Sequence, residues 1–448
     1  MSSSLPIEML EANLNDYSVT VRAQALAGLD LLARQGAVPL EPAADIANLH
    51  CHTFFSFNAY GYSPSGLAWL AKRRGFKMLG IVDFDVLDGV EEFLAACELL
   101  GVRGSAGMET RVYIPEFAAH EINSPGEPGV YYHMGIGFSS SRTPTEVAPV
   151  LAGLRQRAEQ RNRVMVARLN TYLSPVVVDY DLDVLPLTPN GNATERHILV
   201  AFIQAAARYN SHPVSFWAEK LKLPQEQVAG QIGDYPVFQN TVRAKLMKRG
   251  GVGYTQPGSD TFPTVEEVNQ LVVSCGALPC ATWLDGTSSG EQVIEDLLSL
   301  LIAKGAVALN IIPDRNWNIT DAELRHTKVE KLYQVVDLAH KLDLPLNIGT
   351  EMNAYGQKLV DDFDAPVLAP VRKAFLDGAY FIYGHTVMQR ALGLGYQSEW
   401  ASHYLPVRRD RNAFYTRMGR QTVPGADGMT RLKSFTSANV PAEFLSLN

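Results

Sequence analysis

The fold is decided by residues 48–113, NLHCHTFFSFNAYGYSPSGLAWLAKRRGFKMLGIVDFDVLDGVEEFLAACELLGVRGSAGMETRVY. Within this stretch, short apolar runs such as KMLGIVDF alternate with helix-like segments that end at Gly75 and Gly101. Strands and helices that alternate with short glycine-marked joins are typical of βα units sharing a parallel sheet. We therefore predict an α/β fold for the core of the protein.

The βα alternation stops near residue 140 and resumes at residue 263. Between these points the sequence is mostly helical in pattern. Neither half of the βα set would close a barrel alone, so we predict one barrel interrupted by a helical insertion. A late apolar run, AYFIYGHTV, is predicted as a further strand. The predicted segments are a helical N-terminal extension (1–45), the first part of the barrel (46–140), a helical insertion domain (141–262), the second part of the barrel (263–390) and a C-terminal extension (391–448).

The composition is ordinary for a soluble globular enzyme with a large core, with 46% hydrophobic and 19% charged residues among 448. The net charge of −8 disfavours an extended nucleic-acid surface, although a local basic pocket could still hold a small phosphorylated molecule. Four scattered cysteines without a CxxC pair indicate neither a disulfide framework nor a zinc ribbon. No secretory pattern or membrane-length apolar stretch is present, so we expect a cytoplasmic protein. The oligomeric state is left open.

The strongest chemical signal is His50-Cys51-His52 at the end of the first core strand. Residues two apart in a strand point to the same side, so both imidazoles can reach one point at the carboxyl end of a barrel. Imidazole is a good ligand for zinc, iron and manganese. The alternative is that two polar residues lie near a loop by chance, and an isolated HxH pattern does not decide between the two readings. Cys51 points to the opposite side and is expected to be packed.

The whole opening stretch resembles proteins of the polymerase-and-histidinol-phosphatase (PHP) family. Their pattern runs from an HxHT-x-x-S strand end, through a helix headed by Ser-Pro, to a Thr-Asp-His-Asp strand end and then Gly-x-Glu. Two later segments, PTVEEVNQLVVSCGALPCATW and LNIGTEMNAYG, resemble the family's Ala-His-Pro and Gly-Ser-Asp-x-His-Gly segments, and TERHILVAF partly matches a motif of its helical insertion. The likeness spans roughly residues 46–138 and 263–355. It implies a distorted (β/α)7 TIM-like barrel of the PHP type, with a helical insertion domain and extra N- and C-terminal segments.

The resemblance also implies a set of metal ligands. The first metal position of the family expects two histidines, a bridging glutamate and an aspartate, and here it contains His50, His52 and Glu109, with Glu351 in place of the aspartate. His133, in YYHMGIGF, stands where the family has a further histidine ligand. The cofactor implied is one or two divalent ions, namely zinc, manganese or iron.

One of the three metal positions of the family is predicted to be lost. Phe57, Phe84 and Asn353 stand where its ligands are expected, and aromatic rings cannot ligate a divalent ion. At the third position Thr282 replaces the histidine of Ala-His-Pro, and a substitute ligand would have to come from His197, Asp285 or His385.

Further residues are candidates for catalysis and for substrate binding. Asp83 is predicted to orient one of the two histidines, the alternative being a cap on the following helix. His385 is a candidate catalytic residue at the barrel mouth, although a hydrogen-bonded structural histidine fits its context equally well. The candidate phosphate contacts, each of which has a solvated surface role as its alternative, are Arg196, His197, Lys358 and Arg111.

These features favour a metal-dependent hydrolase, most simply a phosphoesterase that attacks a small phosphorylated substrate with a metal-activated water. A second hypothesis is a catalytically degenerate PHP barrel that serves as a ligand-binding or structural module. A third is an amidohydrolase-type barrel acting on C–N bonds. That superfamily also begins with HxH, but it expects two further histidines on middle strands.

Overall fold

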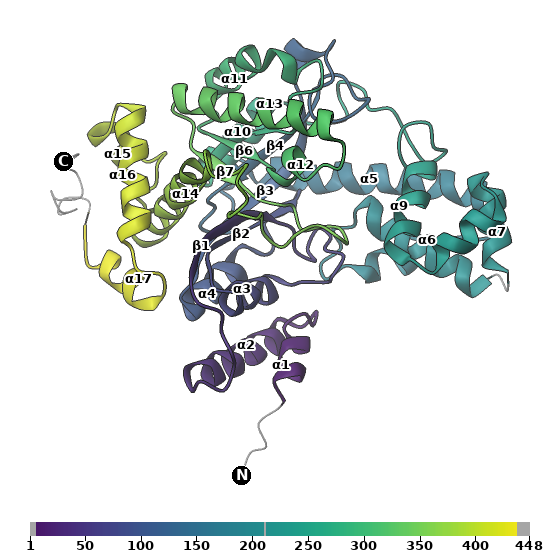
Figure 1. Cartoon of the computed structure of the whole chain (residues 1–448), viewed down its shortest axis with the longest axis horizontal. Helices are drawn as coiled ribbons and strands as arrows, with labels where there is room; N and C mark the ends of the chain where they lie inside the picture. The colour runs from purple at the N-terminus through teal and green to yellow at the C-terminus, as the bar shows by residue number, and fades with distance from the viewer. Residues whose placement is uncertain (1–5, 210–211, 437–448) are drawn as a thin grey trace.

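The computed structural model describes residues 6–209 and 212–436. Within these ranges the core is a seven-stranded sheet whose strands neighbour one another in sequence order (Figure 1). Residue Cys51, at the end of the first strand, also forms a bridge to Glu351 beyond the last strand, so the sheet curls into a nearly closed barrel. The predicted α/β barrel is therefore confirmed. Its strands are β1 (Ala44–Cys51), β2 (Phe76–Phe84), β3 (Arg103–Tyr113), β4 (Val130–Ile136), β5 (Leu278–Trp283), β6 (Ala308–Ile311) and β7 (Leu346–Ile348).

One strand departs from the predicted parallel arrangement. Strand β4 pairs antiparallel with both β3 and β5, whereas the other neighbouring pairs are parallel. The connection between β3 and β4 carries only the short 3-10 turn η1 (Pro115–Phe117) and no crossover helix. Antiparallel neighbours need no such helix, which is why the chain can reverse here. This reversal decides which side chains of β4 face the barrel mouth.

Helices surround the outside of the barrel, and several of them begin with clear caps. The Ser63 side chain accepts from the Gly66 amide at the start of α3, and Thr264 and Glu267 form a capping box at α10. These caps fix where the chain turns from strand to helix. The helices around the barrel are α3 (Pro64–Arg73), α4 (Val90–Leu100), α10 (Val265–Ser274), α11 (Ile294–Ala303), preceded by the 3-10 turn η4 (Glu291–Val293), α12 (Asp314–Trp317), α13 (Ala322–Lys341) and α14 (Arg372–Leu392).

The run AYFIYGHTV is not a strand, which corrects the sequence prediction. It lies inside the 21-residue helix α14, which packs on β7 and crosses α16 (Arg408–Gln421). A Cβ atom at Gly384 would collide with the backbone of Tyr415, and one at Gly419 with the backbone of Tyr380. The two glycines therefore allow the two helices to touch. Burial between β7 and α16 outweighs the strand preference of the aromatic residues.

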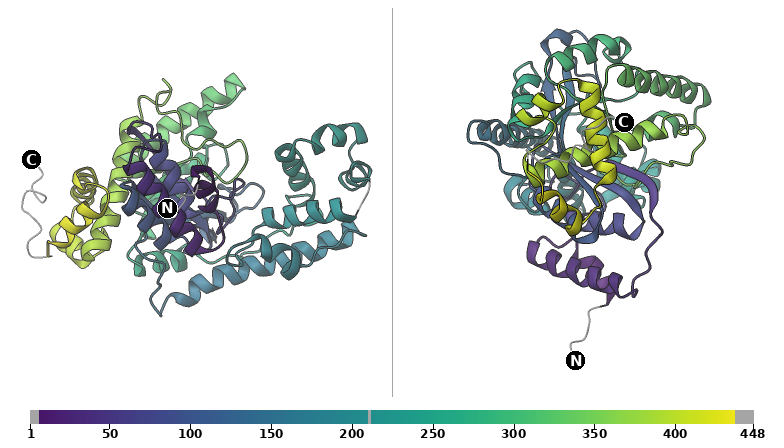
Figure 2. Two further views of the ribbon diagram at one scale, coloured as in Figure 1. Left: turned by 90° about the horizontal axis from the view of Figure 1, so that it is seen from below. Right: turned by 90° about the vertical axis from the view of Figure 1, so that its left-hand side faces the viewer.

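A second group of helices lies between β4 and α10 in the chain and has a hydrophobic core of its own. It projects to the side of the barrel away from the C-terminal helices (Figures 1 and 2). The helical insertion expected from the sequence is thus present in the fold. Its members are α5 (Ala148–Leu173), the turns η2 (Tyr180–Val184) and η3 (Leu185–Leu187), α6 (Glu195–Tyr209), α7 (Pro213–Leu221), α8 (Gln225–Ile232) and α9 (Tyr235–Leu246).

Both ends of the chain add helices to the barrel. The N-terminal pair is α1 (Ile7–Asn13) and α2 (Val19–Arg34), and the C-terminal set comprises α15 (Glu399–Tyr404), α16 and α17 (Ala426–Lys433). A buried ion pair between Arg22 of α2 and Glu92 of α4 ties the N-terminal pair to the barrel. None of the helices in the described part of the chain is both long and apolar enough to cross a membrane.

Candidate metal centre

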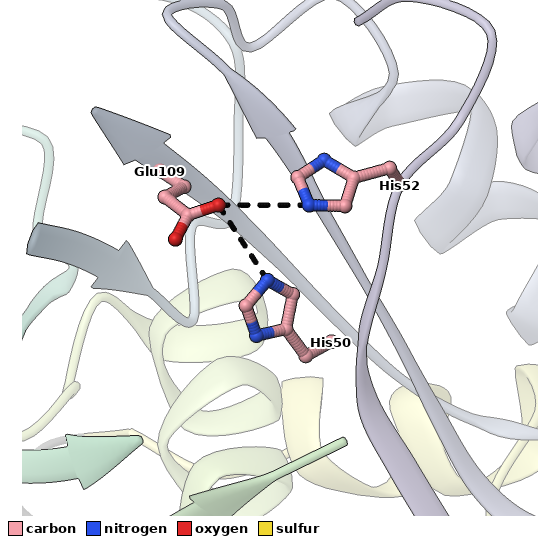
Figure 3. A group of neighbouring side chains, drawn as sticks. All are labelled: His50, His52 and Glu109. Atoms are coloured by element: carbon pink, nitrogen blue, oxygen red, sulfur yellow. Dashed lines mark ion pairs between the residues drawn. The ribbon is translucent and has the colours of Figure 1, made fainter. Parts of the chain in front are cut away.

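Three buried side chains converge at the carboxyl ends of β1 and β3. His50 Nε2 lies 3.7 Å and His52 Nε2 3.5 Å from the same oxygen, Glu109 Oε2 (Figure 3). The candidate ligand atoms all lie within 4.8 Å of one another. Strand alternation places the two histidines on one side of β1, and the parallel register of β2 and β3 brings Glu109 beside them. We call these three residues the His-His-Glu cluster.

The partner of Nδ1, the ring nitrogen that faces away from Glu109, fixes the tautomer of His52. His52 Nδ1 lies 3.2 Å from Ser56 Oγ, and the Ser56 hydroxyl donates to Asp83 Oδ1 at 2.6 Å. Because Ser56 has only one proton to give, it must accept the proton on His52 Nδ1. The lone pair of His52 is therefore on Nε2, the atom that faces Glu109.

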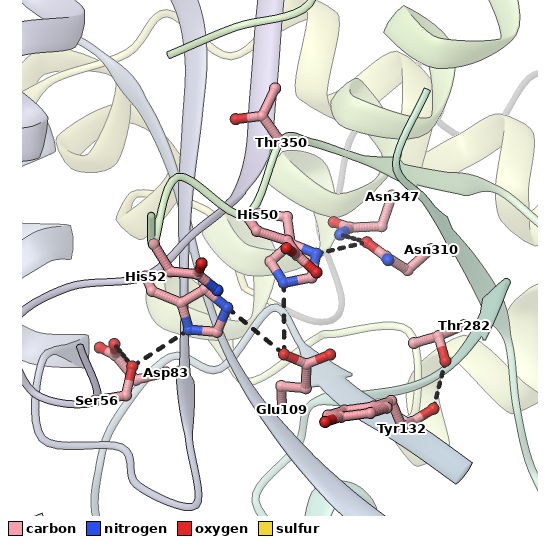
Figure 4. A network of polar contacts seen from close by, with 12 residues as sticks. His50, His52, Ser56, Asp83, Glu109, Tyr132, Thr282, Asn310, Asn347 and Thr350 are labelled. Atoms are coloured by element: carbon pink, nitrogen blue, oxygen red, sulfur yellow. Dashed lines mark hydrogen bonds and ion pairs between the residues drawn. The ribbon is translucent and has the colours of Figure 1, made fainter. Parts of the chain in front are cut away.

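A second chain of contacts fixes the tautomer of His50. His50 Nδ1 lies 3.2 Å from Asn310 Oδ1, which also accepts a hydrogen bond from Asn347 Nδ2 at 2.8 Å (Figure 4). An oxygen that accepts from both neighbours requires a proton on His50 Nδ1. Orienting a histidine ligand through its distal nitrogen is the usual arrangement around protein metal ions.

The His-His-Glu cluster has the chemistry of a divalent metal site. Neither Nε2 atom has a hydrogen-bond partner among the residues that the structure describes. Burial lowers the pKa of His52 to about 3, helped by the charge on His50, so this ring is neutral and able to ligate. Two nitrogen lone pairs and a carboxylate that face one point repel one another unless a cation or a proton lies between them. The residues present therefore fit a divalent ion.

Without a metal, a proton shared by His50 and Glu109 would balance the site. Burial acts to lower the pKa of His50, but the contact with Glu109 outweighs it and raises the pKa overall. Burial raises the pKa of Glu109 more than His50 lowers it. Metal binding would have to displace this proton.

Glu351 lies close to the cluster, but its carboxylate is hydrogen-bonded to other residues. Its Oε2 accepts hydrogen bonds from Arg315 Nη2 at 2.6 Å and from Gln357 Nε2 at 3.0 Å. Burial acts to raise its pKa, yet Arg315 and the two histidines outweigh burial and lower it. The carboxylate is therefore ionised and paired with an arginine. It is not part of the His-His-Glu cluster.

The structure does not bring His133 to the site, and we correct that assignment. In the antiparallel register Thr110 pairs with His133 and Glu109 pairs with Met134. Paired residues point to the same side of a sheet, so His133 faces away from Glu109. Its Nε2 lies 2.6 Å from Asn269 Oδ1 on α10. The residue of β4 that reaches the mouth of the barrel is its neighbour Tyr132, whose ring lies beside Glu109 (Figure 4).

His385 also lies away from the cluster, and its proposed catalytic role is corrected in the same way. It is a fully buried residue of α14 whose Nε2 donates to the carbonyl of Gly137 at 3.1 Å, while its Nδ1 accepts from the amide of Tyr396 at 3.0 Å. Burial lowers its pKa to about 4. His385 is thus a structural residue that ties α14 to the end of β4.

Asp83 reaches His52 through another residue and does not contact it directly. It accepts from the Thr53 amide at 2.8 Å, the Thr53 hydroxyl at 2.7 Å and the Ser56 hydroxyl. Its link to His52 therefore runs through Ser56. These contacts are those expected of a residue that orients His52, and they are not those of a cap on the following helix.

A pocket of about 970 Å³ opens above the cluster, between the barrel mouth and the helical insertion. Its wall includes the aromatic residues Phe57, Phe84 and Tyr132. The Phe84 ring stacks on His52 with centroids 4.5 Å apart. Phe84 stands where the family resemblance implies a metal ligand, and its ring offers no ligand atom. The acidic residues of the lining are Asp85, Glu109, Glu127, Glu195 and Glu351, and the basic ones are Arg111, Arg161, Arg196, Arg243, Lys248, Arg249 and Arg315.

Two of the four predicted phosphate contacts line this pocket. The Arg196 guanidinium lies 5.7 Å from the centroid of the Phe57 ring, and Arg111 lies 4.4 Å from that of Phe262. The other two, His197 and Lys358, are not lining residues. His197 Nδ1 accepts from the Thr194 amide at 3.0 Å.

Lys358 is paired with other residues and does not line the pocket. Its Nζ lies 3.0 Å from Asp314 Oδ1 and 4.4 Å from the centroid of the Trp317 ring. Asp285, another candidate ligand, is paired with Lys328 at 2.7 Å. Neither residue belongs to the His-His-Glu cluster.

Sequence reasoning missed several residues of the site. Asn310 and Asn347 are polar residues inside the short apolar strands β6 and β7, and a buried polar residue of this kind is a detectable signal. Ser56 is the serine of the quoted HxHT-x-x-S pattern. Arg161 lies on α5 and Arg315 on the short helix α12. The place of both at the pocket depends on the fold, and no local pattern marks them.

No model of a known protein family matches the chain, and a search of curated proteins finds no significant relative. Solved structures similar to it include the following two. One is an amidohydrolase from Chromobacterium violaceum with bound sulfate and no metal (17% identity, 73% of this chain and 96% of that chain, TM-score 0.47). The other is a candidate metal-dependent phosphoesterase from Bifidobacterium adolescentis (20% identity, 73% and 97%, TM-score 0.47). Both likenesses are too distant to indicate an activity for this chain.

Proposed function

We propose that the protein is a metal-dependent hydrolase of the PHP type that acts on a small phosphorylated substrate. The observation that carries this proposal is the His-His-Glu cluster. Two histidines with their tautomers fixed by buried partners direct Nε2 lone pairs at one carboxylate oxygen. This arrangement matches three protein ligands with an open position.

The proposed cofactor is one divalent ion of zinc, manganese or iron. When bound, it would supply a metal-activated water at neutral pH and polarise a phosphoryl oxygen. Among the residues that the structure describes, no second ion has a comparable set of ligands. His133 points away, Phe84 packs against His52, and Tyr132 occupies the wall beside Glu109.

The pocket favours an anionic substrate. Within the described residues, Arg161 and Arg196 form neither a hydrogen bond nor an ion pair, and each stacks on a phenylalanine, Phe262 and Phe57 respectively. Burial lowers the pKa of both to about 10, so both stay charged at neutral pH. A partly desolvated cation without a partner gains much from a charge-assisted hydrogen bond, and guanidinium groups match phosphate geometry.

The experiment is metal analysis of the purified protein, followed by reconstitution with Zn²⁺, Mn²⁺ or Fe²⁺ and assay against a panel of phosphate monoesters, phosphodiesters and amides. We expect about one ion per chain and metal-dependent release of phosphate. A protein that retains no metal after reconstitution would overturn the proposal and favour a binding or structural module. Metal-dependent cleavage of amides alone would favour an amidohydrolase.

A further inference from the structure

Arg315 and Glu351 form a pair at the edge of the His-His-Glu cluster that the proposed chemistry does not yet use. Arg315 lies on α12, which follows β6, the strand that supplies Asn310 to His50. One of its nitrogens, Nη2, is bound to Glu351. Its side chain is 42% exposed, and it faces the pocket. The guanidinium therefore keeps donors available to a ligand.

The backbone fixes the position of Glu351. Glu351 and Met352 both have left-handed conformations, with φ of 66° and 50°, which are costly for residues other than glycine. The His52 amide donates to the Glu351 carbonyl at 2.9 Å, and Asn58 Nδ2 donates to that of Met352 at 2.8 Å. These bonds hold a strained turn in place, as is common at functional sites. They direct the Glu351 carboxylate at Arg315.

The two glutamates of the site differ in their partners. Within the described part of the chain, the Glu109 carboxylate pairs only with the two histidine Nε2 atoms. Glu351 accepts two hydrogen bonds on one oxygen, from Arg315 and Gln357. The contacts of Glu109 are those of a metal ligand, and the contacts of Glu351 are those of a carboxylate that orients an arginine.

The formal charges of the site explain why such an arginine is needed. With neutral histidines, a divalent ion and the two ionised glutamates Glu109 and Glu351 sum to zero, so these groups alone have no net attraction for a phosphate dianion next to the metal. Arg315 gives the site a net positive charge. Electrostatic stabilisation of transferring phosphoryl groups by arginine is a general device, and it substitutes for part of what a second metal ion provides.

We propose that Arg315 is a substrate-binding residue that contacts the phosphoryl group beside the metal, and that Glu351 positions this arginine instead of ligating the metal. This inference rests on the proposed function. It assigns a role to Arg315 that the sequence did not mark, and it changes the role that the family resemblance implied for Glu351.

The test separates metal binding from anion binding in four variants. Arg315→Ala and Arg315→Lys probe the cation, Glu351→Gln probes its orientation, and Glu109→Gln is the comparison for a true ligand. The control is Arg409→Ala, an exposed arginine that pairs with Asp343 at 3.1 Å away from the pocket. Zn²⁺ affinity is measured by chelator competition, and binding of inorganic phosphate to metal-loaded and metal-free protein by calorimetry.

We expect Arg315→Ala and Glu351→Gln to weaken phosphate binding about 10–100-fold, as for loss of a charge-assisted hydrogen bond, while Zn²⁺ affinity stays near that of the wild type. Arg315→Lys should recover part of the phosphate affinity, because it keeps the charge but loses the planar donor set. Glu109→Gln should lose Zn²⁺, and Arg409→Ala should change neither quantity.

Two results would overturn the inference: unchanged phosphate binding in Arg315→Ala, or a loss of Zn²⁺ in Glu351→Gln as large as in Glu109→Gln. Failure of the proposed function has a different signature, namely a wild-type protein that binds no metal. In that case phosphate binding to the metal-free variants still decides the role of Arg315. Circular dichroism of each variant verifies that it is folded.

Discussion

Histidines that the sequence marks as metal ligands lie at the end of β1 and in β4, but only those at the end of β1 reach the site. His50 and His52 have partners on Nδ1, and their Nε2 atoms face Glu109 without a hydrogen-bond partner in the described ranges. His133 has the opposite arrangement, with Nε2 bonded to Asn269 outside the barrel. The difference teaches that strand direction and the partner of the far nitrogen, rather than residue type, decide whether a histidine can ligate.

The largest test of this contrast is removal of one imidazole from each strand. His52→Ala should lower metal affinity by more than about 100-fold, because loss of outer partners alone typically costs about 10–100-fold. His133→Ala should retain the wild-type metal content, since its ring faces α10. Metal content is measured by elemental analysis after dialysis against a weak chelator. Equal metal loss in both folded variants would contradict the assignment.

The second test uses acid. Burial lowers the pKa of His133 to about 4, whereas an unfolded histidine titrates near 6.5. Below pH 6.5 His133 binds a proton in the unfolded chain but not in the folded chain. The free energy of unfolding therefore falls as the pH drops towards 4. At about 1.4 kcal/mol per unit, His133 accounts for roughly 3 kcal/mol of this loss.

His133→Asn should therefore reduce the difference in denaturation midpoint between pH 7 and pH 4.5, although its stability at pH 7 will be lower. Urea unfolding monitored by circular dichroism measures the effect. His340→Gln, on the exposed surface of α13, controls for removal of a histidine that is not buried. An unchanged acid sensitivity in His133→Asn would show that other buried groups, such as His385, carry the effect.

A third test removes the partners instead of the histidines. Ser56→Ala or Asn310→Ala frees the ring of His52 or His50 to change tautomer, so metal affinity should fall about 10–100-fold. Asn269→Ala removes the matching partner of His133 and should leave metal affinity unchanged, although it also breaks a bond to the carbonyl of Lys304. Chelator competition on the three variants gives the comparison. A similar metal loss in Asn269→Ala would link β4 to the site after all.

Much of this could be predicted from the sequence, and the failures have physical causes. The βα alternation and the HxH spacing are local patterns, so they predicted the α/β core and the placement of His50 and His52 on one face. The direction of β4 is not a local property. The segment PEFAAHEINSPGEPG before it is rich in loop residues and has no helical pattern, which was the available signal for a reversal.

The misreading of α14 has another cause. Tyr380, Phe381, Ile382 and Tyr383 favour a strand by propensity, but residues 372–378 before them extend the pattern to a length that a strand rarely has. Tertiary burial between β7 and α16 then decides in favour of a helix. His385, assigned to the barrel mouth on the strand reading, moves to the outer helix with the rest of the segment.

The smallest expected effect extends the contrast from histidines to cations. Lys358 and Arg196 were both candidate phosphate contacts, but Lys358 is engaged by Asp314 and Trp317, while Arg196 faces the pocket without an ion pair in the described residues. Lys358→Ala should therefore change the affinity for inorganic phosphate by less than about twofold, as for an exposed ion pair. Arg196→Ala should weaken it about tenfold or more, because a charge-assisted hydrogen bond is lost. Calorimetry that shows equal losses in both variants would contradict this prediction. The existing partners of a cation would then not decide whether it binds phosphate, unlike the partners of the histidines, which decide whether they can ligate a metal.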